Sequence, residues 1–325
     1  MARQRAATQT VTAFADRFDG LVANIEKVIQ GKEEAIRLAL VCLIAEGHLL
    51  LEDVPGVGKT SLAKAMAASI DGEFSRIQFT PDLLPSDVTG VMVYNRGSGG
   101  FEFRHGAVFA HIVLGDEINR ASPKTQSALL EAMEERQVTV DSVTYALEAP
   151  FMVIATQNPI EHEGTYPLPE SQLDRFLMRI EMGYPDKDAE IRILDTRGLA
   201  FAAEELSPVV KAKDIEAMTR IAQGVHVAPG IKSYLVDLAD ATRRHPRLTL
   251  GVSPRGTLSL LRAARATAAA EGRDFVLPDD CKALAFPVLE HRLMLTPEAQ
   301  MGGVSVGDVL DEVLASVAVP TAKAK

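Results

Sequence analysis

The sequence lacks the residues on which several classes of protein depend. In 325 residues it has no tryptophan and two cysteines, Cys42 and Cys281, too few for a disulfide scaffold or a cysteine-rich metal site. No stretch reaches the roughly 18 uninterrupted apolar residues of a membrane helix. The start, MARQRAATQT, has no apolar core of a secretory signal. We therefore expect a cytoplasmic protein with no membrane span.

Positive charge is outnumbered, since 34 Lys and Arg against 44 Asp and Glu give a formal net charge of -10. Long-range electrostatics should repel nucleic acid unless a local basic surface overrides the sum. The chain is 47% hydrophobic and 24% charged, a balance typical of a globular protein that buries a full core, and its length favours two domains.

The first part of the chain alternates short apolar strands with helices. Apolar residues recur at helical spacing from Phe14 to Glu46 with a break at Gly31, and again at Leu62, Met66 and Ile70. Strands are expected at 48–51, 75–79, 111–116, 151–156 and 176–182. This alternation predicts an α/β fold with a parallel sheet covered by helices on both faces.

Two insertions and a change of composition divide the chain further. Segments 90–106 and 136–150 each have the pattern of a hairpin, and Ser142 stands in the second turn where glycine would suit a type I′ turn better. Ala- and Leu-rich helices follow Pro185. We predict these parts: a flexible start 1–13, an α/β core 14–184, a linker 185–210, an all-α domain 211–317 and a flexible tail 318–325.

The stretch EDVPGVGKTS (52–61) has the features of a phosphate-binding loop. It follows an apolar strand and opens a helix, so its backbone N–H groups can face an anion. Lys59 would reach the β- and γ-phosphates, and the hydroxyl of Thr60 would bind Mg²⁺. Asp53 stands where the usual pattern has its first glycine, and we expect Pro55 and Gly56 to supply the turn.

A pair of carboxylates supports nucleotide hydrolysis. Asp116 and Glu117 end the apolar strand HIVLGD, where one acid can serve the Mg²⁺ shell and the other can polarise water. Gly115 lies inside this strand, and a glycine there weakens it. A solvated strand end is the alternative for the pair alone.

Three more polar residues are candidates. Asn158 follows a buried strand, where its amide could contact a γ-phosphate or orient water; a plain Asn-Pro turn is the alternative. Arg175 precedes the last strand, away from its own phosphate loop, where it could act on a neighbouring subunit or pair with Asp174 or Glu170. Arg255 begins a helix and needs an anionic partner. The competitors of Arg255 for that role are Arg243, Arg244 and Arg262.

Together these segments resemble the MoxR family of AAA+ ATPases. The resemblance rests on EDVPGVGKT, GDEINRASPKTQSALLEAMEE, ATQNP, LPESQLDRF and GVSPRG and covers about 14 to 317. It implies ATP and Mg²⁺ as ligands, with Lys59 and Thr60 as Walker A, Asp116 and Glu117 as Walker B, and Asn158 as sensor 1. It further implies Arg175 as arginine finger and Arg255 as sensor 2. The nucleotide-binding residues it implies are Val28, Ile29 and Gly31 beside adenine, and Pro55, Gly56, Val57, Gly58, Lys59, Thr60 and Ser61 beside the phosphates.

The resemblance also implies how the protein works. Similar proteins form rings of six, remodel a protein partner that often has a von Willebrand factor A domain, and help mature or insert a cofactor into a client enzyme. Segments 90–106 and 136–150 match the helix-2 insert and the pre-sensor-1 hairpin. The helix around 211–225 matches the pre-sensor-2 element, and the all-α domain matches the lid.

Three alternatives remain open. A DNA motor would need cations on the second hairpin, but its tip, QVTVDSVTY, carries an aspartate and no lysine or arginine. An ATPase subunit of a metal-chelatase complex has a similar domain order. A nucleotide switch that does not hydrolyse is disfavoured by the pair Asp116 and Glu117.

Overall fold

The computed structural model describes residues 2–158, 164–185, 187–195 and 203–320. Two helices come first, α1 (Ala2–Glu26) and α2 (Glu33–Ile44), separated by a turn that contains Gly31. The expected break is therefore confirmed. In the segment 1–13, where we predicted a flexible start, α1 is helical from Ala2, because this segment is rich in Ala, Gln and Arg, which favour helix, and has no Gly or Pro.

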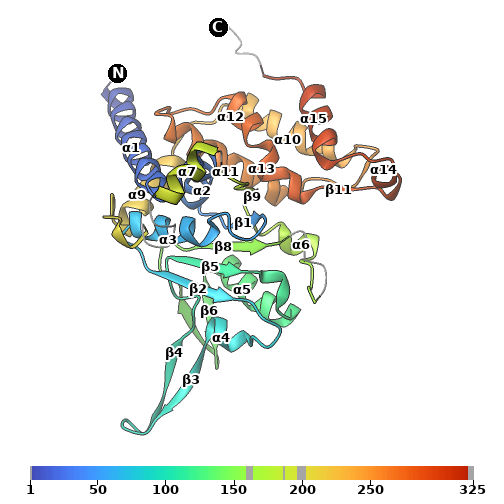
Figure 1. Cartoon of the computed structure of the whole chain (residues 1–325). Coiled ribbons are helices and arrows are strands. Elements are labelled where there is room, and N and C mark those ends of the chain that lie inside the picture. The colour runs from blue at the N-terminus through green and yellow to red at the C-terminus, as the bar shows by residue number, and fades with distance from the viewer. Residues whose placement is uncertain (1, 159–163, 186, 196–202, 321–325) are drawn as a thin grey trace.

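The predicted parallel sheet is confirmed. Its order is β2-β5-β8-β1-β9, and every neighbouring pair is parallel. Figure 1 shows the sheet in the middle of the molecule. The strands are β1 (Leu49–Glu52), β2 (Phe74–Gln78), β5 (Ile112–Asp116), β8 (Met152–Gln157) and β9 (Met178–Ile180).

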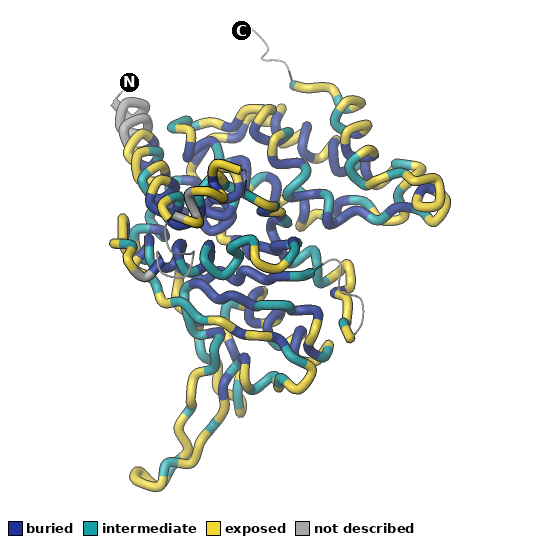
Figure 2. Tube along the Cα trace, viewed as in Figure 1, coloured by how far each residue is buried: buried dark blue, intermediate teal, exposed yellow. Residues whose placement is uncertain are grey.

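Helices cover both faces of this sheet because its strands are apolar on both sides. Leu49 and Leu51 belong to one buried cluster together with α1, α2 and α3 (Lys59–Ser69). Leu50 belongs to a second cluster, with the apolar face of α5 (Pro123–Glu135). Successive side chains of a strand point to opposite faces, so β1 alone contributes to both layers. Figure 2 shows the buried interior of this layered core.

Both predicted insertions are hairpins. The first joins β3 (Gly90–Asn95) to β4 (Gly100–His105) after the short helix α4 (Pro85–Thr89) and projects from the body (Figure 1). The second joins β6 (Gln137–Val140) to β7 (Val143–Ala146). Asp141 and Ser142 have φ of 48° and 67°, so the second turn has the two positive φ angles of a type I′ turn without glycine. Our expectation against that turn is wrong.

The rest of the chain is mainly helical and lies against one side of the core (Figure 1). The predicted linker contains α7 (Lys187–Asp195) and the 3-10 turn η2 (Ala203–Glu205), while 186 and 196–202 lie outside the described residues. Helix α9 (Ala212–Gln223) packs between α1, α2 and α11. The remaining elements are α10 (Pro229–Arg243), β10 (Leu248–Leu250), α11 (Pro254–Ala270), α12 (Pro278–Ala283), α13 (Ala285–Leu289), η3 (Glu290–Arg292), β11 (Met294–Leu295), α14 (Pro297–Met301) and α15 (Val306–Ser316).

The last described residue is Pro320. Of the predicted tail 318–325, residues 321–325 lie outside the described part. Within the described part, no helix is both long enough and apolar enough to span a membrane.

Candidate active site

The segment between β1 and α3 forms a tight loop around two glycines. Gly56 and Gly58 have φ of 88° and 95°, in the left-handed region that side chains with a Cβ rarely adopt. Gly58 is the residue that precedes α3, so the loop leads directly into the positive end of that helix. Lys59 Nζ donates to the carbonyl oxygens of Asp53 and Val54, at 2.7 Å and 3.1 Å. The loop thus has the form of an anion-binding site, and the ammonium group of Lys59 lies against its backbone.

Asp53 gives this loop a fixed start in place of the usual glycine. Its Oδ1 accepts from the N–H of Val54 at 2.8 Å. Its Oδ2 accepts from the N–H groups of Met182 and Gly183, at 2.7 Å and 2.6 Å. The buried carboxylate therefore ties the loop to the segment that follows β9, and the turn itself is made at Gly56, as expected.

The loop opens into a cavity of about 340 Å³, here called the phosphate-loop cavity. Residues of the loop that follows β1, of α3 and of three strands, β2, β5 and β8, meet in it, because parallel strands have their carboxyl ends at one edge of the sheet. Most of the predicted site residues are brought together here, and Arg76 and Thr156 join them. The lining residues are Pro55, Gly56, Gly58, Lys59, Thr60, Ser61, Arg76, Asp116, Glu117, Thr156 and Asn158.

The two carboxylates of the cavity are held by a hydroxyl that sequence reasoning missed. Thr156 Oγ1 donates to Asp116 Oδ1 at 2.7 Å and accepts from the N–H of Glu117 at 2.9 Å. Glu117 has φ of 56°, an uncommon conformation for a residue with a side chain. Its Oε2 accepts from Gln78 Nε2 at 3.0 Å and Arg120 Nη1 at 2.9 Å. The pair is therefore oriented from two neighbouring strands.

Gly115 does not disrupt its strand. It pairs with Ile77 of β2 and Ala155 of β8, so β5 continues to Asp116. A Cβ at this position would lie 3.3 Å from Cε2 of Phe79 and 3.4 Å from Cδ2 of Leu129. The glycine therefore makes room for close packing under the carboxylates, and the strand pairing continues to Asp116.

The charges of the cavity suit a bound polyanion and a divalent cation. Burial lowers the pKa of the Lys59 ammonium group, while Asp53, Asp116 and Glu117 act in the opposite direction and favour its charged form. Lys59 supplies the cation that phosphate needs, and Thr60 and Asp116 supply oxygen ligands of the kind that Mg²⁺ prefers. The residues present therefore fit a magnesium-bound nucleotide.

The predicted adenine-contacting residues lie apart from this cavity. Val28 and Ile29 are buried in the hydrophobic core, so they are not at the surface of the phosphate-loop cavity. Gly31 lines a second cavity of about 660 Å³ between the core and the helical part, together with Met182 and Phe286. That cavity adjoins the loop through Met182, whose N–H donates to Asp53.

Arg175 and Arg255 lie at the opposite edge of the sheet. Both line a cavity of about 260 Å³, here called the arginine cavity, together with His48, Glu134 and Arg262. His48 precedes β1, whereas the phosphate loop follows it. Four residues of strand at about 3.3 Å each separate these edges by about 13 Å. Among the described residues, none lines both cavities.

The partner of both arginines is a residue that sequence reasoning missed. Arg175 Nη2 lies 3.0 Å from Oε2 of Glu134, and Arg255 Nη2 is paired with Oε1 of the same carboxylate. The pairing of Arg175 with Asp174 or Glu170 that we considered is not the one found. Glu134 lies in the last turn of α5. Nothing in the sequence distinguishes this acid from the neighbouring residues of the helix.

The competing arginines differ in their surroundings. Arg243 Nε donates to the carbonyl of Val252 at 2.8 Å, and Arg244 is an exposed partner of Asp240 at 3.0 Å. Arg262 lines the arginine cavity.

Comparisons with known proteins agree with this geometry. Residues 48–178 match the ATPase family associated with various cellular activities (AAA), and residues 240–313 match the AAA lid domain. The chain is 52% identical over 299 residues to YeaC of Bacillus subtilis, covering 92% of this chain and 93% of that protein. It is 41% identical over 312 residues to Chaperone MoxR1 of Mycobacterium tuberculosis, covering 93% of this chain and 82% of that protein.

Two further likenesses bear on the fold and on the alternatives. A crystal structure from Cytophaga hutchinsonii, described as that of a candidate ATPase, superposes with a TM-score of 0.91 at 37% identity, covering 99% of this chain and 100% of the other. The magnesium-chelatase 38 kDa subunit of Cereibacter sphaeroides is 31% identical over 58% of this chain and 57% of that subunit. The likeness to Chaperone MoxR1 extends over most of the chain, whereas that to the chelatase subunit covers little more than half. The chain belongs to the MoxR family of AAA+ ATPases.

Proposed function

We propose that the protein hydrolyses ATP with Mg²⁺ in the phosphate-loop cavity and uses the cycle to remodel a protein partner. One observation carries this proposal. A lysine, a hydroxyl, two carboxylates and an amide, from Lys59, Thr60, Asp116, Glu117 and Asn158, meet in a single cavity beside a helix start. Hydrolysis of a nucleoside triphosphate needs these groups together.

Each group has a proposed role. The backbone N–H groups of the loop and Lys59 hold the phosphates, while Thr60 and Asp116 hold the metal. Mg²⁺, when bound, neutralises charge on the β- and γ-phosphates. Glu117 accepts a proton from the attacking water, and Asn158 orients that water or the γ-phosphate.

We further propose that Arg175 and Arg255 act on the nucleotide of a neighbouring copy in a ring of six. Because both lie at the amino edge of the sheet, they are remote from the phosphate-loop cavity of their own chain. An arginine supplied by a neighbour is worth about 10³ to 10⁵ in hydrolysis rate. Val28, Ile29 and Gly31 remain proposed neighbours of adenine, and of the three Gly31 lines the cavity to which Met182 also contributes.

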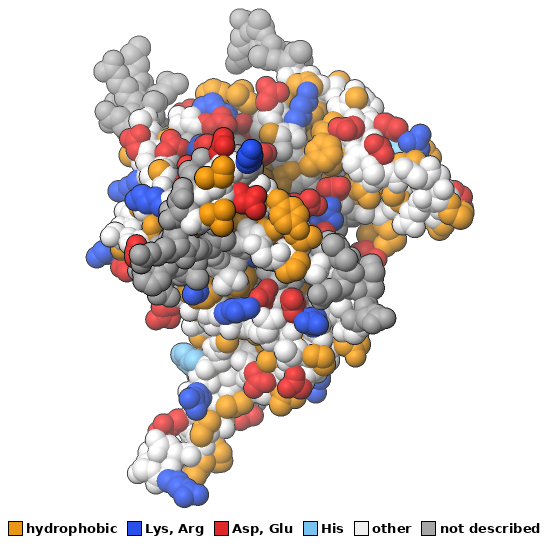
Figure 3. All heavy atoms as spheres, in the orientation of Figure 1, with side chains coloured by type: hydrophobic (Ala, Val, Ile, Leu, Met, Phe, Trp, Pro, Cys, Tyr) orange, Lys and Arg blue, Asp and Glu red, His pale blue; other side chains and the backbone are white. Residues whose placement is uncertain are grey.

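The two hairpins are the proposed moving parts. Phe103 of β4 stacks on Tyr145 of β7 with ring centroids 4.0 Å apart, so the insertions contact one another. The first hairpin exposes Val93, Tyr94 and Phe101, and Figure 3 shows hydrophobic side chains along it. An apolar exposed surface of this kind suits contact with a protein more than with DNA. The proposed partners are a protein with a von Willebrand factor A domain and a client enzyme that it helps to mature or load with a cofactor.

Partner trapping tests the function. Glu117→Gln should bind ATP, lose turnover by about 10² to 10⁴-fold and retain its partner, because it lacks only the proposed base. Lys59→Ala, the control, should bind neither ATP nor partner in the ATP-dependent assay. Normal hydrolysis by Glu117→Gln would show that the base is assigned wrongly. A partner with a metal-binding adhesion domain supports the chaperone role, whereas salt-sensitive stimulation by DNA would favour the motor.

A further inference from the structure

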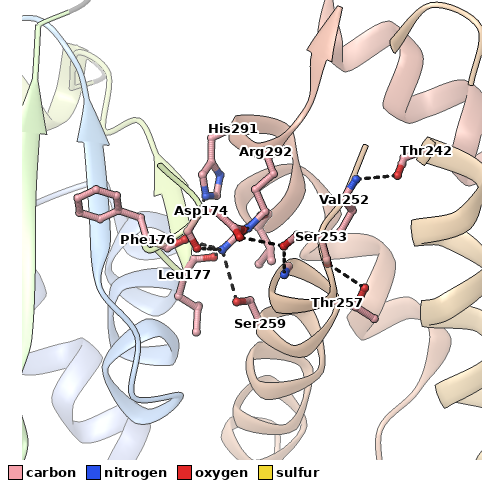
Figure 4. A network of polar contacts seen from close by, with 12 residues as sticks. Asp174, Phe176, Leu177, Thr242, Val252, Ser253, Thr257, Ser259, His291 and Arg292 are labelled. Atoms are coloured by element: carbon pink, nitrogen blue, oxygen red, sulfur yellow. Dashed lines mark hydrogen bonds and ion pairs between the residues drawn. The ribbon is translucent and has the colours of Figure 1, made fainter. Parts of the chain in front are cut away.

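A lid arginine is buried in the core at the junction of the two domains. Arg292 ends η3 and is 4% exposed. Its Nε lies 2.7 Å from Asp174 Oδ1, its Nη2 donates to the carbonyl of Phe176 at 2.6 Å, and its Nη1 donates to that of Leu177 at 3.2 Å. Figure 4 shows this guanidinium pointing from the lid into the core segment before β9. One side chain of the lid is thus bonded to three residues, Asp174, Phe176 and Leu177, that lie on both sides of Arg175 in the chain.

The same carboxylate also holds the start of α11. Ser253 Oγ donates to Asp174 Oδ2 at 2.9 Å and accepts from the N–H of Gly256 at 3.1 Å, which caps the helix (Figure 4). A Cβ on Gly256 would lie 2.9 Å from Cδ of Arg292, so the arginine passes directly against the first turn. Asp174 therefore fixes both Arg292 and α11.

The two arginines proposed to act on a neighbour are attached to this network. Arg175 follows Asp174 in the core, and Arg255 comes two residues after Ser253 in the lid. Both guanidinium groups meet on the carboxylate of Glu134, which shows that they can contact one anion at the same time. Their common position depends on how the core segment and α11 are held together.

We propose that Arg292, Asp174 and Ser253 are positioning residues that hold Arg175 and Arg255 as one pair for a phosphate group of the neighbouring copy's nucleotide. None of the three touches that phosphate. This inference rests on the proposed function, since it assumes that the pair is used across an interface. Because replacing a buried ion pair by apolar residues is often neutral for stability, we assign Arg292 a positional role from the bonds it makes.

Ser253→Ala is the direct test, because it removes the bond to Asp174 and leaves every residue of the phosphate-loop cavity in place. We expect at least a tenfold loss of ATP turnover with nucleotide affinity unchanged. Arg292→Lys, which keeps the charge and loses the planar fork, should act in the same way. Ser305→Ala is the matched control: Ser305 caps α15 in the lid by accepting from the N–H of Asp308 at 3.0 Å, outside the network. It should leave turnover within twofold of the unaltered protein.

Mixed rings separate a positioning defect from a folding defect. Mixing Arg175→Ala with Lys59→Ala should restore turnover, because one copy supplies the pocket and the other the arginines. If this pair gives no rescue, the proposed action across an interface fails, and the present inference fails with it. If this mixture restores turnover, mixtures that contain Ser253→Ala test the positioning role.

Ser253→Ala should be rescued by Lys59→Ala, which has both arginines in place, and should not be rescued by Arg175→Ala, which has no complete arginine pair to offer. A variant that merely folds badly would be rescued by neither. Rescue by Arg175→Ala, or full turnover of both Ser253→Ala and Arg292→Lys alone, would overturn the positioning role while leaving the proposed function intact.

Discussion

Arg76 Nη2 lies 2.6 Å from Asp116 Oδ2, so the carboxylate proposed to serve Mg²⁺ is paired with a cation from the neighbouring strand. Arg76 lines the phosphate-loop cavity and is half-exposed. The ion pair therefore competes with the metal for one carboxylate. Because Arg76 is 48% exposed, although Asp116 is only 15% exposed, we expect the pair to contribute about 0.2 to 1 kcal/mol, as exposed pairs do.

Arg76→Gln should accordingly lower the Mg²⁺ concentration for half-maximal ATP turnover by about 1.4- to 5-fold, the equivalent of that energy. A titration of turnover against Mg²⁺ measures it. Arg120→Gln is the control, since Arg120 pairs with Glu117 at 2.9 Å and not with Asp116. A higher Mg²⁺ requirement in Arg76→Gln would contradict the competition and indicate that Arg76 helps to hold the phosphates.

Gly115→Val should destabilise the core. Its new side chain would meet Phe79 and Leu129, which already lie within 3.4 Å of the position of a Cβ. Overpacking of this kind costs about 1 to 3 kcal/mol in the free energy of unfolding. Denaturant unfolding measures the loss, and an unchanged midpoint would show that the two neighbours can move aside.

The stack of Phe103 on Tyr145 should couple the two hairpins energetically. A double-mutant cycle of Phe103→Ala and Tyr145→Ala, read by denaturant unfolding, should give a coupling of about 0.5 to 1.5 kcal/mol. Phe101→Ala is the control, because Phe101 contacts Tyr94 within the first hairpin. Its cycle with Tyr145→Ala should show no coupling. Additive losses in the test cycle would mean that the hairpins move independently.

Stability should fall as the pH drops below about 6.5, because His48 is buried in its neutral form. Its Nδ1 accepts from the N–H of Val153 at 3.0 Å, and its Nε2 lies 3.0 Å from the carbonyl of Met133. Burial, aided by the charge of Arg136, lowers the pKa of His48 to about 3. Between these values the unfolded chain binds a proton that the folded chain does not.

The free energy of unfolding should therefore decrease by up to about 1.4 kcal/mol per pH unit from this residue as the pH falls from 6.5 toward 3. Burial also lowers the pKa of His291, which adds a loss in the same direction. Urea unfolding at pH 7, 6 and 5 measures the slope. His48→Gln, which keeps one donor and one acceptor, should reduce this slope by the contribution of one proton. An unchanged slope would show that another group takes up the proton.

The sequence predicts the parts of the site that lie next to strand ends. Asp116 ends an apolar strand, Lys59 and Asn158 come after one, and a parallel sheet brings those ends to one edge. Thr156 could have been found by the same rule, since it ends a predicted strand, whereas Arg76 lies in the middle of β2 and only its side chain lines the cavity. We overlooked Arg76 because it belongs to no contiguous motif, and Thr156 because only Asn158 of ATQNP was given a role.

Contacts between distant segments could not be predicted in this way. Glu134 joins Arg175 and Arg255 only because α5, the segment before β9 and α11 converge, and helical periodicity does not fix that convergence. Arg292 is similar, since a charged residue in a lid helix gives no sign that it will be buried against another domain. Local rules also misjudged the turn at Ser142, where the flanking strands impose a positive φ.

The central claim is that the nucleotide is bound in the phosphate-loop cavity of one copy and is contacted by the arginine pair of the next. A crystal structure of the assembled protein with Mg²⁺ and a slowly hydrolysed ATP analogue tests it most directly. We expect the triphosphate beside Lys59, Thr60 and Asp116, with Arg175 and Arg255 of an adjacent copy directed at its terminal phosphate. An analogue bound elsewhere, or arginines that stay on Glu134 far from any nucleotide, would contradict the account.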